Sequence, residues 1–177
     1  HCVGVCVRSI LYNIVENYMT NVDEVMALVK KYDHLFSRRD GGNAFSTQYG
    51  TASLKQIHQY NMPAKLTEAI FKTIPMKWTD RLNYCINKYE PGDYIPRHKD
   101  SNGGYWMFKL VFLSSDKPHF KYWDDADQEH TVQEVPGAMF NMRLGTPHEV
   151  TEIQEDENPK YSLCIMQGID MNVRKVA

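Results

Sequence analysis

The chain has 177 residues, of which 42% are hydrophobic and 24% are charged, and its formal net charge is −2. This length fits one domain with a sizeable core, so we expect a single domain over residues 1–177. No apolar run reaches the roughly 20 residues that a membrane span needs. The net charge gives no overall attraction to nucleic acid, although it leaves a local basic patch open.

The first residues carry neither an initiating Met nor the basic and then apolar pattern of a secretion signal. We therefore expect the chain to be a segment of a longer protein. The four cysteines, Cys2, Cys6, Cys85 and Cys164, form no CxxC pair, which argues against a zinc ribbon or a thioredoxin-type motif. Cys85 and Cys164 lie in apolar runs, and we interpret them as free buried thiols in a reducing intracellular compartment.

Residues 1–80 are expected to supply helical support and a possible substrate lid. Residues 9–31 are predicted to be helical, because Val22, Val25 and Val29 recur at helical spacing. A second helix is predicted from Pro63 to about Ile74, since proline suits the first helical turn. Between them, residues 37–50 are rich in turn formers and predict a loop with a short strand.

From residue 82 onwards, short segments rich in β-branched and aromatic residues alternate with turn signals. They predict strands near residues 82–89, 94–98, 105–114, 118–123, 130–135, 138–143, 147–153 and 160–167. Together with the preceding helices, this pattern predicts an α+β fold. Its core, over residues 81–170, would be a jelly roll, or double-stranded β-helix, supported by the N-terminal helices.

His98 and Asp100 are two residues apart, a spacing that places both side chains on the same face of a strand. A third metal ligand is expected from His148, near the start of a later strand. Two imidazoles and one carboxylate form the facial triad of non-haem Fe(II) oxygenases, which leaves coordination positions open. An HxD motif alone is a weak signal, and the alternative is a surface histidine beside a solvated Lys99 and Asp100.

Lys160 begins the last predicted strand. A lysine that points inwards from such a strand is a costly buried charge unless an anion accompanies it. With the triad in place, we interpret Lys160 as the partner of a carboxylate of 2-oxoglutarate, which is a dianion. The alternative is an exposed lysine that pairs weakly with Glu155 or Glu157.

These features occur in a fixed order: Y-x-P-G at residues 89–92, HxD at 98–100, a distal histidine at 148 and a basic residue at 160. In this order, residues 82–170 resemble the Fe(II)/2-oxoglutarate-dependent oxygenases. The resemblance implies Fe(II) held by His98, Asp100 and His148, with 2-oxoglutarate as co-substrate and O₂ as oxidant. It also implies that 2-oxoglutarate is bound by Lys160, Tyr89, Asn87 and Ser162.

Two branches of that superfamily are represented. The segment from Asn83 to Asp100 looks like the AlkB-like nucleic-acid demethylases, in which Asn-x-Tyr-x-Pro-Gly, here residues 87–92, precedes the HxD motif. Residues 146–150 and the start of the last strand look more like prolyl and aspartyl/asparaginyl hydroxylases. The AlkB-like family carries two arginines six apart on that strand, where this chain has Lys160 and Met166. We expect a macromolecular substrate and no membrane partner.

The resemblance leans narrowly to nucleic-acid demethylation or hydroxylation, and protein side-chain hydroxylation is the alternative. A second alternative is a non-catalytic β-sandwich that binds metal or a partner. Candidate substrate contacts are aromatic residues that could stack on the substrate and basic residues that could meet phosphates or another anion: Tyr122, Trp123, Arg143, Arg38 and Arg39. Core aromatics and ordinary solvated charges are the simpler interpretation of these residues.

Overall fold

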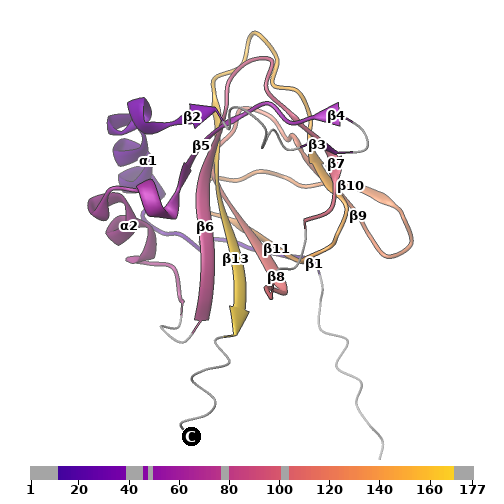
Figure 1. The fold of residues 1–177 in the computed structure, drawn as a ribbon, viewed down its shortest axis with the longest axis horizontal. Coiled ribbons are helices and arrows are strands. Elements are labelled where there is room, and N and C mark those ends of the chain that lie inside the picture. Colours follow the sequence, from indigo (N-terminus) through magenta and orange to yellow (C-terminus); the bar gives the residue numbers. More distant parts are fainter. Residues whose placement is uncertain (1–11, 39–45, 48–49, 77–79, 101–103, 170–177) are drawn as a thin grey trace, which may run out of the picture.

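The computed structural model describes residues 12–38, 46–47, 50–76, 80–100 and 104–169. These residues form two stacked β-sheets, and two α-helices lie against the outer face of the larger sheet (Figure 1). The predicted α+β jelly-roll fold with supporting N-terminal helices is confirmed. No helix within the described ranges is long and apolar enough to cross a bilayer.

The helical layer consists of α1 (Val22–Lys31) and α2 (Ala64–Phe71), with the short 3₁₀ helices η1 (Asp33–Leu35) and η2 (Gln59–Asn61). Helix α1 buries Val25 and Val29, and its acidic first turn and basic last turn both complement the helix dipole. Pro63 directly precedes α2, as the sequence predicts.

The prediction of a helix over residues 9–31 is wrong in its first half. Residues Tyr12–Val15 form strand β1, and helix α1 begins only at Val22. The aromatic and β-branched side chains of this segment suit a strand. Strand β1 pairs with β11 over residues 139–142, more than a hundred positions along the chain, so local periodicity could not reveal this partner.

The larger sheet has seven antiparallel strands in the order β1-β11-β8-β13-β6-β5-β2. Their bounds are β11 (Met139–Arg143), β8 (Met107–Ser114), β13 (Lys160–Ile169), β6 (Asp80–Tyr89), β5 (Lys55–His58) and β2 (Ser37–Arg38). Strand β2 lies in the segment that we predicted to be loop and short strand. The remainder of the expected lid, residues 39–45 and 48–49, lies outside the described residues.

The smaller sheet has the order β10-β9-β12-β7, with β10 (Glu129–Thr131), β9 (Phe120–Trp123), β12 (His148–Val150) and β7 (Ile95–His98). A two-stranded sheet of β3 (Ser46–Thr47) and β4 (Gly50–Thr51) lies beside β7 (Figure 1). Each of the eight strands predicted after residue 82 corresponds to a strand here. The segments at 130–135 and 147–153 contain shorter strands than we predicted.

Alternation along the central strands divides the core into two clusters. On β13, Tyr161, Leu163 and Ile165 pack on the helical side, whereas Cys164 belongs to the cluster between the two sheets. Because successive strand residues face opposite sides, Lys160 and Ser162 share the face of Cys164. The inner face of the large sheet therefore carries polar side chains into the interior.

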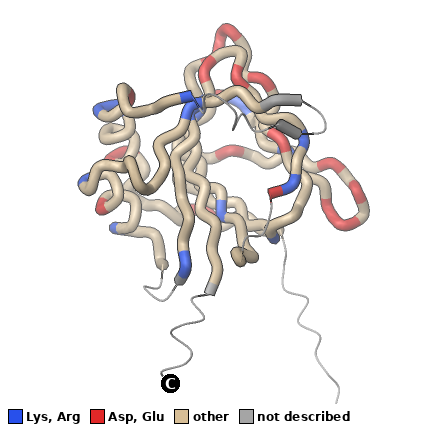
Figure 2. Tube along the Cα trace, viewed as in Figure 1, with Lys and Arg blue, Asp and Glu red and all other residues tan. Residues whose placement is uncertain are grey.

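Acidic residues gather in the turn between β9 and β10 and in the loop that leads to β13 (Figure 2). In the β9–β10 turn, Asp125 accepts hydrogen bonds from Tyr12 and Arg143, and Asp127 accepts one from Arg97. Asp124 pairs with His130. Arg97, Arg143 and His130 are thus each paired with an aspartate of this turn.

Replacing Gly137 with alanine should destabilise the fold. Gly137 has φ +84°, and an added Cβ would lie 2.7 Å from the carbonyl oxygen of Met19. We expect Gly137→Ala to lower the free energy of unfolding by about 2–4 kcal/mol, as backbone strain and the clash add. Gly145→Ala is the matched control, because Gly145 has φ +88° and nothing within 4 Å of its Cβ position.

The control should lose only about 1–2 kcal/mol from backbone strain. Urea unfolding of both variants measures the difference. Equal losses in the two variants would show that the approach of Met19 to Gly137 adds nothing.

Candidate metal centre and its cavity

Three metal-ligating side chains meet where strands β7 and β12 pair. His98 ends β7, His148 begins β12, and the two are direct partners in the antiparallel register. Asp100 follows His98 by two residues, so it faces the same side. The imidazole centroids of His98 and His148 lie 4.1 Å apart, and the ligand atoms of the three residues lie within 4.8 Å of one another.

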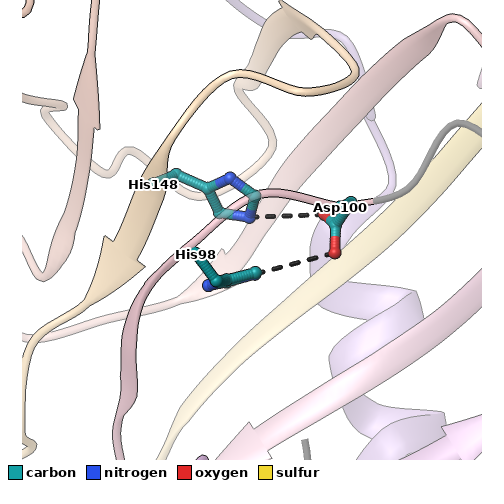
Figure 3. A group of neighbouring side chains, drawn as sticks. All are labelled: His98, Asp100 and His148. Carbon is teal, nitrogen blue, oxygen red and sulfur yellow. Dashed lines mark ion pairs between the residues drawn. The ribbon is translucent and has the colours of Figure 1, made fainter. Parts of the chain in front are cut away.

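The geometry of this group fits one metal ion. Nε2 of His98 lies 3.6 Å from Oδ1 of Asp100, and Nε2 of His148 lies 3.4 Å from Oδ2 (Figure 3). Ligands at right angles around a metal, with bonds of about 2.1 Å, lie about 3 Å apart, so only a small contraction is needed. Two imidazoles and one carboxylate on one side of the ion are the donor set of non-haem iron sites.

Backbone contacts orient both histidines as ligands. Nδ1 of His98 donates to the carbonyl of Pro96 at 2.9 Å, and Nδ1 of His148 donates to the carbonyl of Thr146 at 2.8 Å. These bonds leave the proton on Nδ1 and the lone pair on Nε2. Burial, and then the charge of His148, lowers the pKa of His98 to about 4, so its ring is neutral near pH 7.

The metal site opens onto a cavity of about 640 Å³ between the two sheets. Phe108 and Phe120 flank His148, with centroid distances of 5.6 and 5.7 Å. The opposite wall is the inner face of the large sheet, which contributes a mostly polar set from β5, β6 and β13: Gln56, His58, Asn83, Cys85, Asn87, Tyr89, Lys160, Ser162, Cys164 and Met166.

Lys160 lines this cavity and is only 1% exposed. Its ammonium donates to the carboxylate of Glu134, which also accepts from the backbone N–H of His119 and from Ser115. The ammonium also lies over the ring of Phe112, 5.3 Å from its centroid. The alternative interpretation, an exposed lysine that pairs with the acidic loop, is therefore wrong.

The protonation of Lys160 depends on this pair. Burial lowers the pKa of Lys160 to about 7. The carboxylate of Glu134 is in contact with the ammonium, and an adjacent opposite charge favours the charged form of a lysine. We conclude that the two groups form an ion pair. Deletion of one partner from such a pair leaves an uncompensated buried charge.

Asn87, Tyr89 and Ser162 surround Lys160 through the strand register. Lys160 lies opposite Tyr89, and Ser162 lies opposite Asn87. Nδ2 of Asn87 donates to the Tyr89 hydroxyl at 3.1 Å, while its Oδ1 accepts from Gln56 at 2.7 Å. Burial raises the pKa of Tyr89, so its hydroxyl stays protonated.

The candidate substrate aromatics lie on β9, outside the lining of the cavity. Tyr122 stacks on Tyr12 and on His130, with centroid distances of 4.9 and 4.8 Å. Trp123 is buried under the guanidinium of Arg97, 4.1 Å from its ring centroid.

The candidate basic residues are dispersed. Arg38 lines the cavity and donates to Asp93 and Ser53, each at 3.0 Å. Arg143 is exposed and pairs with Asp125. Arg39 lies outside the described residues. The structure thus does not bring Arg38 and Arg143 together at the metal.

Sequence reasoning missed Glu134 and most of the amide-bearing wall. Glu134 lies 26 positions before Lys160 and meets it only in the folded chain. Gln56, His58 and Asn83 line the cavity, and Nε2 of His58 lies 3.0 Å from Oδ1 of Asn83. The alternation of β6 from Asn83 to Tyr89 was the available signal, because Asn83, Asn87 and Tyr89 share one face.

Comparison with known proteins identifies solved structures of similar fold. No family model and no curated protein matches the sequence. A Pseudomonas putida prolyl-4-hydroxylase aligns at 17% identity and TM-score 0.61, over 88% of this chain and 91% of that one. A Trichoplax adhaerens prolyl hydroxylase, solved with a hypoxia inducible factor peptide, aligns at 13% identity and TM-score 0.68, over 94% and 87%.

A viral collagen prolyl hydroxylase from Paramecium Bursaria Chlorella virus-1, solved with 2-oxoglutarate, aligns at 12% identity and TM-score 0.57, over 94% of this chain and 100% of that one. The chain therefore has the fold of the solved 2-oxoglutarate–Fe(II) oxygenases, among them several prolyl hydroxylases.

Loss of a triad histidine should strongly weaken metal binding. We expect His148→Ala to weaken Mn(II) or Fe(II) binding by about a hundredfold or more, because one of three protein ligands is removed. Anaerobic calorimetric titration of the metal measures this. His130→Ala is the control, since His130 is exposed and pairs with Asp124. Equal metal affinity in the two variants would exclude this centre.

Removal of the Glu134 charge should destabilise the protein. We expect Glu134→Gln to lower the free energy of unfolding by about 3–5 kcal/mol, because Lys160 remains buried without its partner. The double variant Glu134→Gln/Lys160→Met should recover most of this loss. Glu129→Gln, which breaks a surface pair with Lys121, should change it by less than about 1 kcal/mol. A loss in Glu134→Gln as small as in the control would contradict a buried ion pair.

Proposed function

We propose that this chain is an Fe(II)- and 2-oxoglutarate-dependent dioxygenase. It couples the oxidative decarboxylation of 2-oxoglutarate to the hydroxylation of a C–H bond in a macromolecular substrate. One observation carries the proposal: the triad of His98, Asp100 and His148 opens onto the same cavity that holds the buried ammonium of Lys160. The fold supports it, because the similar solved structures are oxygenases of this kind.

Fe(II) would be held by His98, Asp100 and His148, which leaves positions on the ion for 2-oxoglutarate and O₂. Fe(II) and 2-oxoglutarate, when bound, would supply the oxidising chemistry, with succinate and CO₂ as the co-products. The chain itself holds the ring of His98 neutral, and the backbone contacts of both imidazoles leave Nε2 free for the ion. Its hydrophobic rings, Phe108 and Phe120, exclude water from the side of His148.

The distal carboxylate of 2-oxoglutarate would bind Lys160. An ammonium has three donors, so Glu134 and a second carboxylate can share it. The hydroxyls of Ser162 and Tyr89 lie on the same face of the sheet, and both can donate to that carboxylate. Asn87, bonded to the Tyr89 hydroxyl, would orient it and contact the co-substrate.

The substrate that fits the charges best is a polypeptide side chain. A phosphodiester needs unneutralised basic residues at the mouth, but Arg38 and Arg143 are each paired with an aspartate. Within the described residues, the cavity wall beyond the triad offers neutral hydrogen-bonding groups from Gln56, Asn61 and Asn83. We therefore favour protein side-chain hydroxylation, as in the prolyl hydroxylases of similar fold.

Nucleic-acid demethylation, towards which the sequence leans, remains the second candidate. The observation in its favour is the AlkB-like arrangement of Asn87 and Tyr89, whose side chains both line the cavity. On this alternative, the paired arginines would have to exchange their carboxylates for phosphates on binding.

Anaerobic titration with Fe(II) and 2-oxoglutarate tests the cofactor assignment. We expect a visible iron-to-ketoacid charge-transfer band that is lost in His98→Ala. The double variant Lys160→Ala/Glu134→Gln, which leaves no unpaired carboxylate, should need about tenfold or more 2-oxoglutarate to reach the same band. Lys121→Ala, a surface change, should titrate like the parent. Absence of a band from the folded, metal-loaded parent protein would refute the oxygenase assignment.

Substrate screening separates the two candidate functions. We expect proline-containing peptides to stimulate succinate formation and to gain one oxygen atom, measured by mass spectrometry. Methylated oligonucleotides should release no formaldehyde, and their binding should be weak even at low salt, because phosphate contacts are lacking. Formaldehyde release from the oligonucleotides, with unmodified peptides, would overturn the peptide assignment in favour of demethylation.

A further inference from the structure

Cys85 and Cys164 are direct partners across the two central strands of the large sheet. Cys85 lies on β6 and Cys164 on β13, and the antiparallel register pairs them. Both are free thiols, and both line the cavity that contains the metal site. Neither has a role in the proposed reaction, although together they occupy the middle of its wall.

Both sulfurs contact the same side chain, and their strand positions suit a cross-link. The amide of Asn87 bridges the thiols of Cys85 and Cys164. The Cys85 thiol donates to Oδ1 of Asn87 at 3.5 Å, and Nδ2 of Asn87 donates to Sγ of Cys164 at 3.3 Å. Opposed residues of an antiparallel pair have Cα atoms about 4.5–5.5 Å apart, within the range of about 4.4–6.8 Å that disulfides use.

We propose that Cys85 and Cys164 form an oxidation site, in which peroxide converts the two thiols to a cross-strand disulfide that disrupts the wall of the cavity. Peroxide reaches Cys85 through the cavity, because this residue is half-buried while Cys164 is 8% exposed. The hydrogen bond with Cys85, and then burial, raises the pKa of the Cys164 thiol, which makes it the second sulfur to react.

The chemistry balances with one peroxide. An S–O bond forms on Cys85 as the O–O bond breaks, and one water leaves. The sulfur of Cys164 then attacks Cys85, the S–S bond forms, and the hydroxyl leaves as a second water. Two thiols lose two electrons and two protons, and hydrogen peroxide is reduced to two waters. A dithiol reductant reverses the change.

The disulfide acts on the cavity through Asn87. Oxidation removes the thiol proton that Cys85 donates to Oδ1 of Asn87 and draws both sulfurs to covalent distance. The same amide holds the Tyr89 hydroxyl and accepts from Gln56. Under the proposed function, on which this second step rests, these groups contact 2-oxoglutarate, so the oxidised form should bind it more weakly.

The test uses the full chain with Cys2→Ser and Cys6→Ser, so that Cys85 and Cys164 are the remaining thiols. The metal-free protein is treated with hydrogen peroxide under anaerobic conditions. We expect an intact mass lower by two hydrogens, a cross-linked peptide that contains Cys85 and Cys164, and reversal by dithiothreitol. Further Cys85→Ser and Cys164→Ser substitutions should each prevent the cross-link. Oxidation of Cys85 to a sulfinic acid without a cross-link, or no reaction in the folded protein, would overturn the site.

A second measurement tests the effect on the cavity. After peroxide is removed and Mn(II) is added, calorimetry should show 2-oxoglutarate binding about fivefold weaker to the oxidised than to the reduced protein, as expected for one lost hydrogen bond. Peroxide should leave the affinity of the Cys85→Ser variant unchanged. Equal affinities of the disulfide and dithiol forms would refute the proposed effect of the disulfide on 2-oxoglutarate binding. If the reduced protein binds no 2-oxoglutarate, the proposed function fails, and the mass measurement still decides the disulfide.

Discussion

The rest of the structure depends on the strict alternation of strands β13 and β6 at the centre of the large sheet. One face of these strands is apolar and packs on the helices, through residues such as Leu163 and Ile165. The other face carries Lys160, Ser162 and Cys164 into the space between the sheets. A slip of the register by one residue would exchange the two faces. The apolar packing of the helices thus fixes which polar groups line the cavity.

A charge inside a hydrophobic domain needs a compensating partner. Lys160 is fully buried, and its partner Glu134 is held in turn by the backbone of His119 and by Ser115. On the helical face, Lys88 has a comparable arrangement. Burial lowers its pKa, but the hydrogen bonds that it donates to Asp33 and Glu90 raise the pKa more, so that it stays charged. Lys88 ties η1 to the sheet, whereas Lys160 faces a cavity large enough for a ligand.

The candidate metal site has fixed imidazole rings, and an arginine that lines its cavity is paired with a carboxylate. Backbone carbonyls of Pro96 and Thr146 fix both imidazoles, so little reorganisation is needed when an ion binds. Arg38, which lines the cavity, is already paired with Asp93, and Arg143 is paired with Asp125. Acidic residues crowd the β9–β10 turn (Figure 2). This combination suits a neutral substrate segment held by amide side chains, with the buried ammonium of Lys160 left for a small dianion.

The sequence by itself determined the jelly-roll class, most strands after residue 82 and the candidate ligands His98, Asp100 and His148, which the structure brings together. Period-two alternation and the HxD spacing are local patterns that can be recognised in the sequence alone. It could not determine that residues 12–15 join the sheet, that Glu134 accompanies Lys160, or that Cys85 faces Cys164. It could not show either that Arg38 and Arg143 are neutralised. These contacts join residues distant in sequence, and only the strand register and the packing of the two sheets decide them, because no local pattern encodes which distant residue becomes a neighbour.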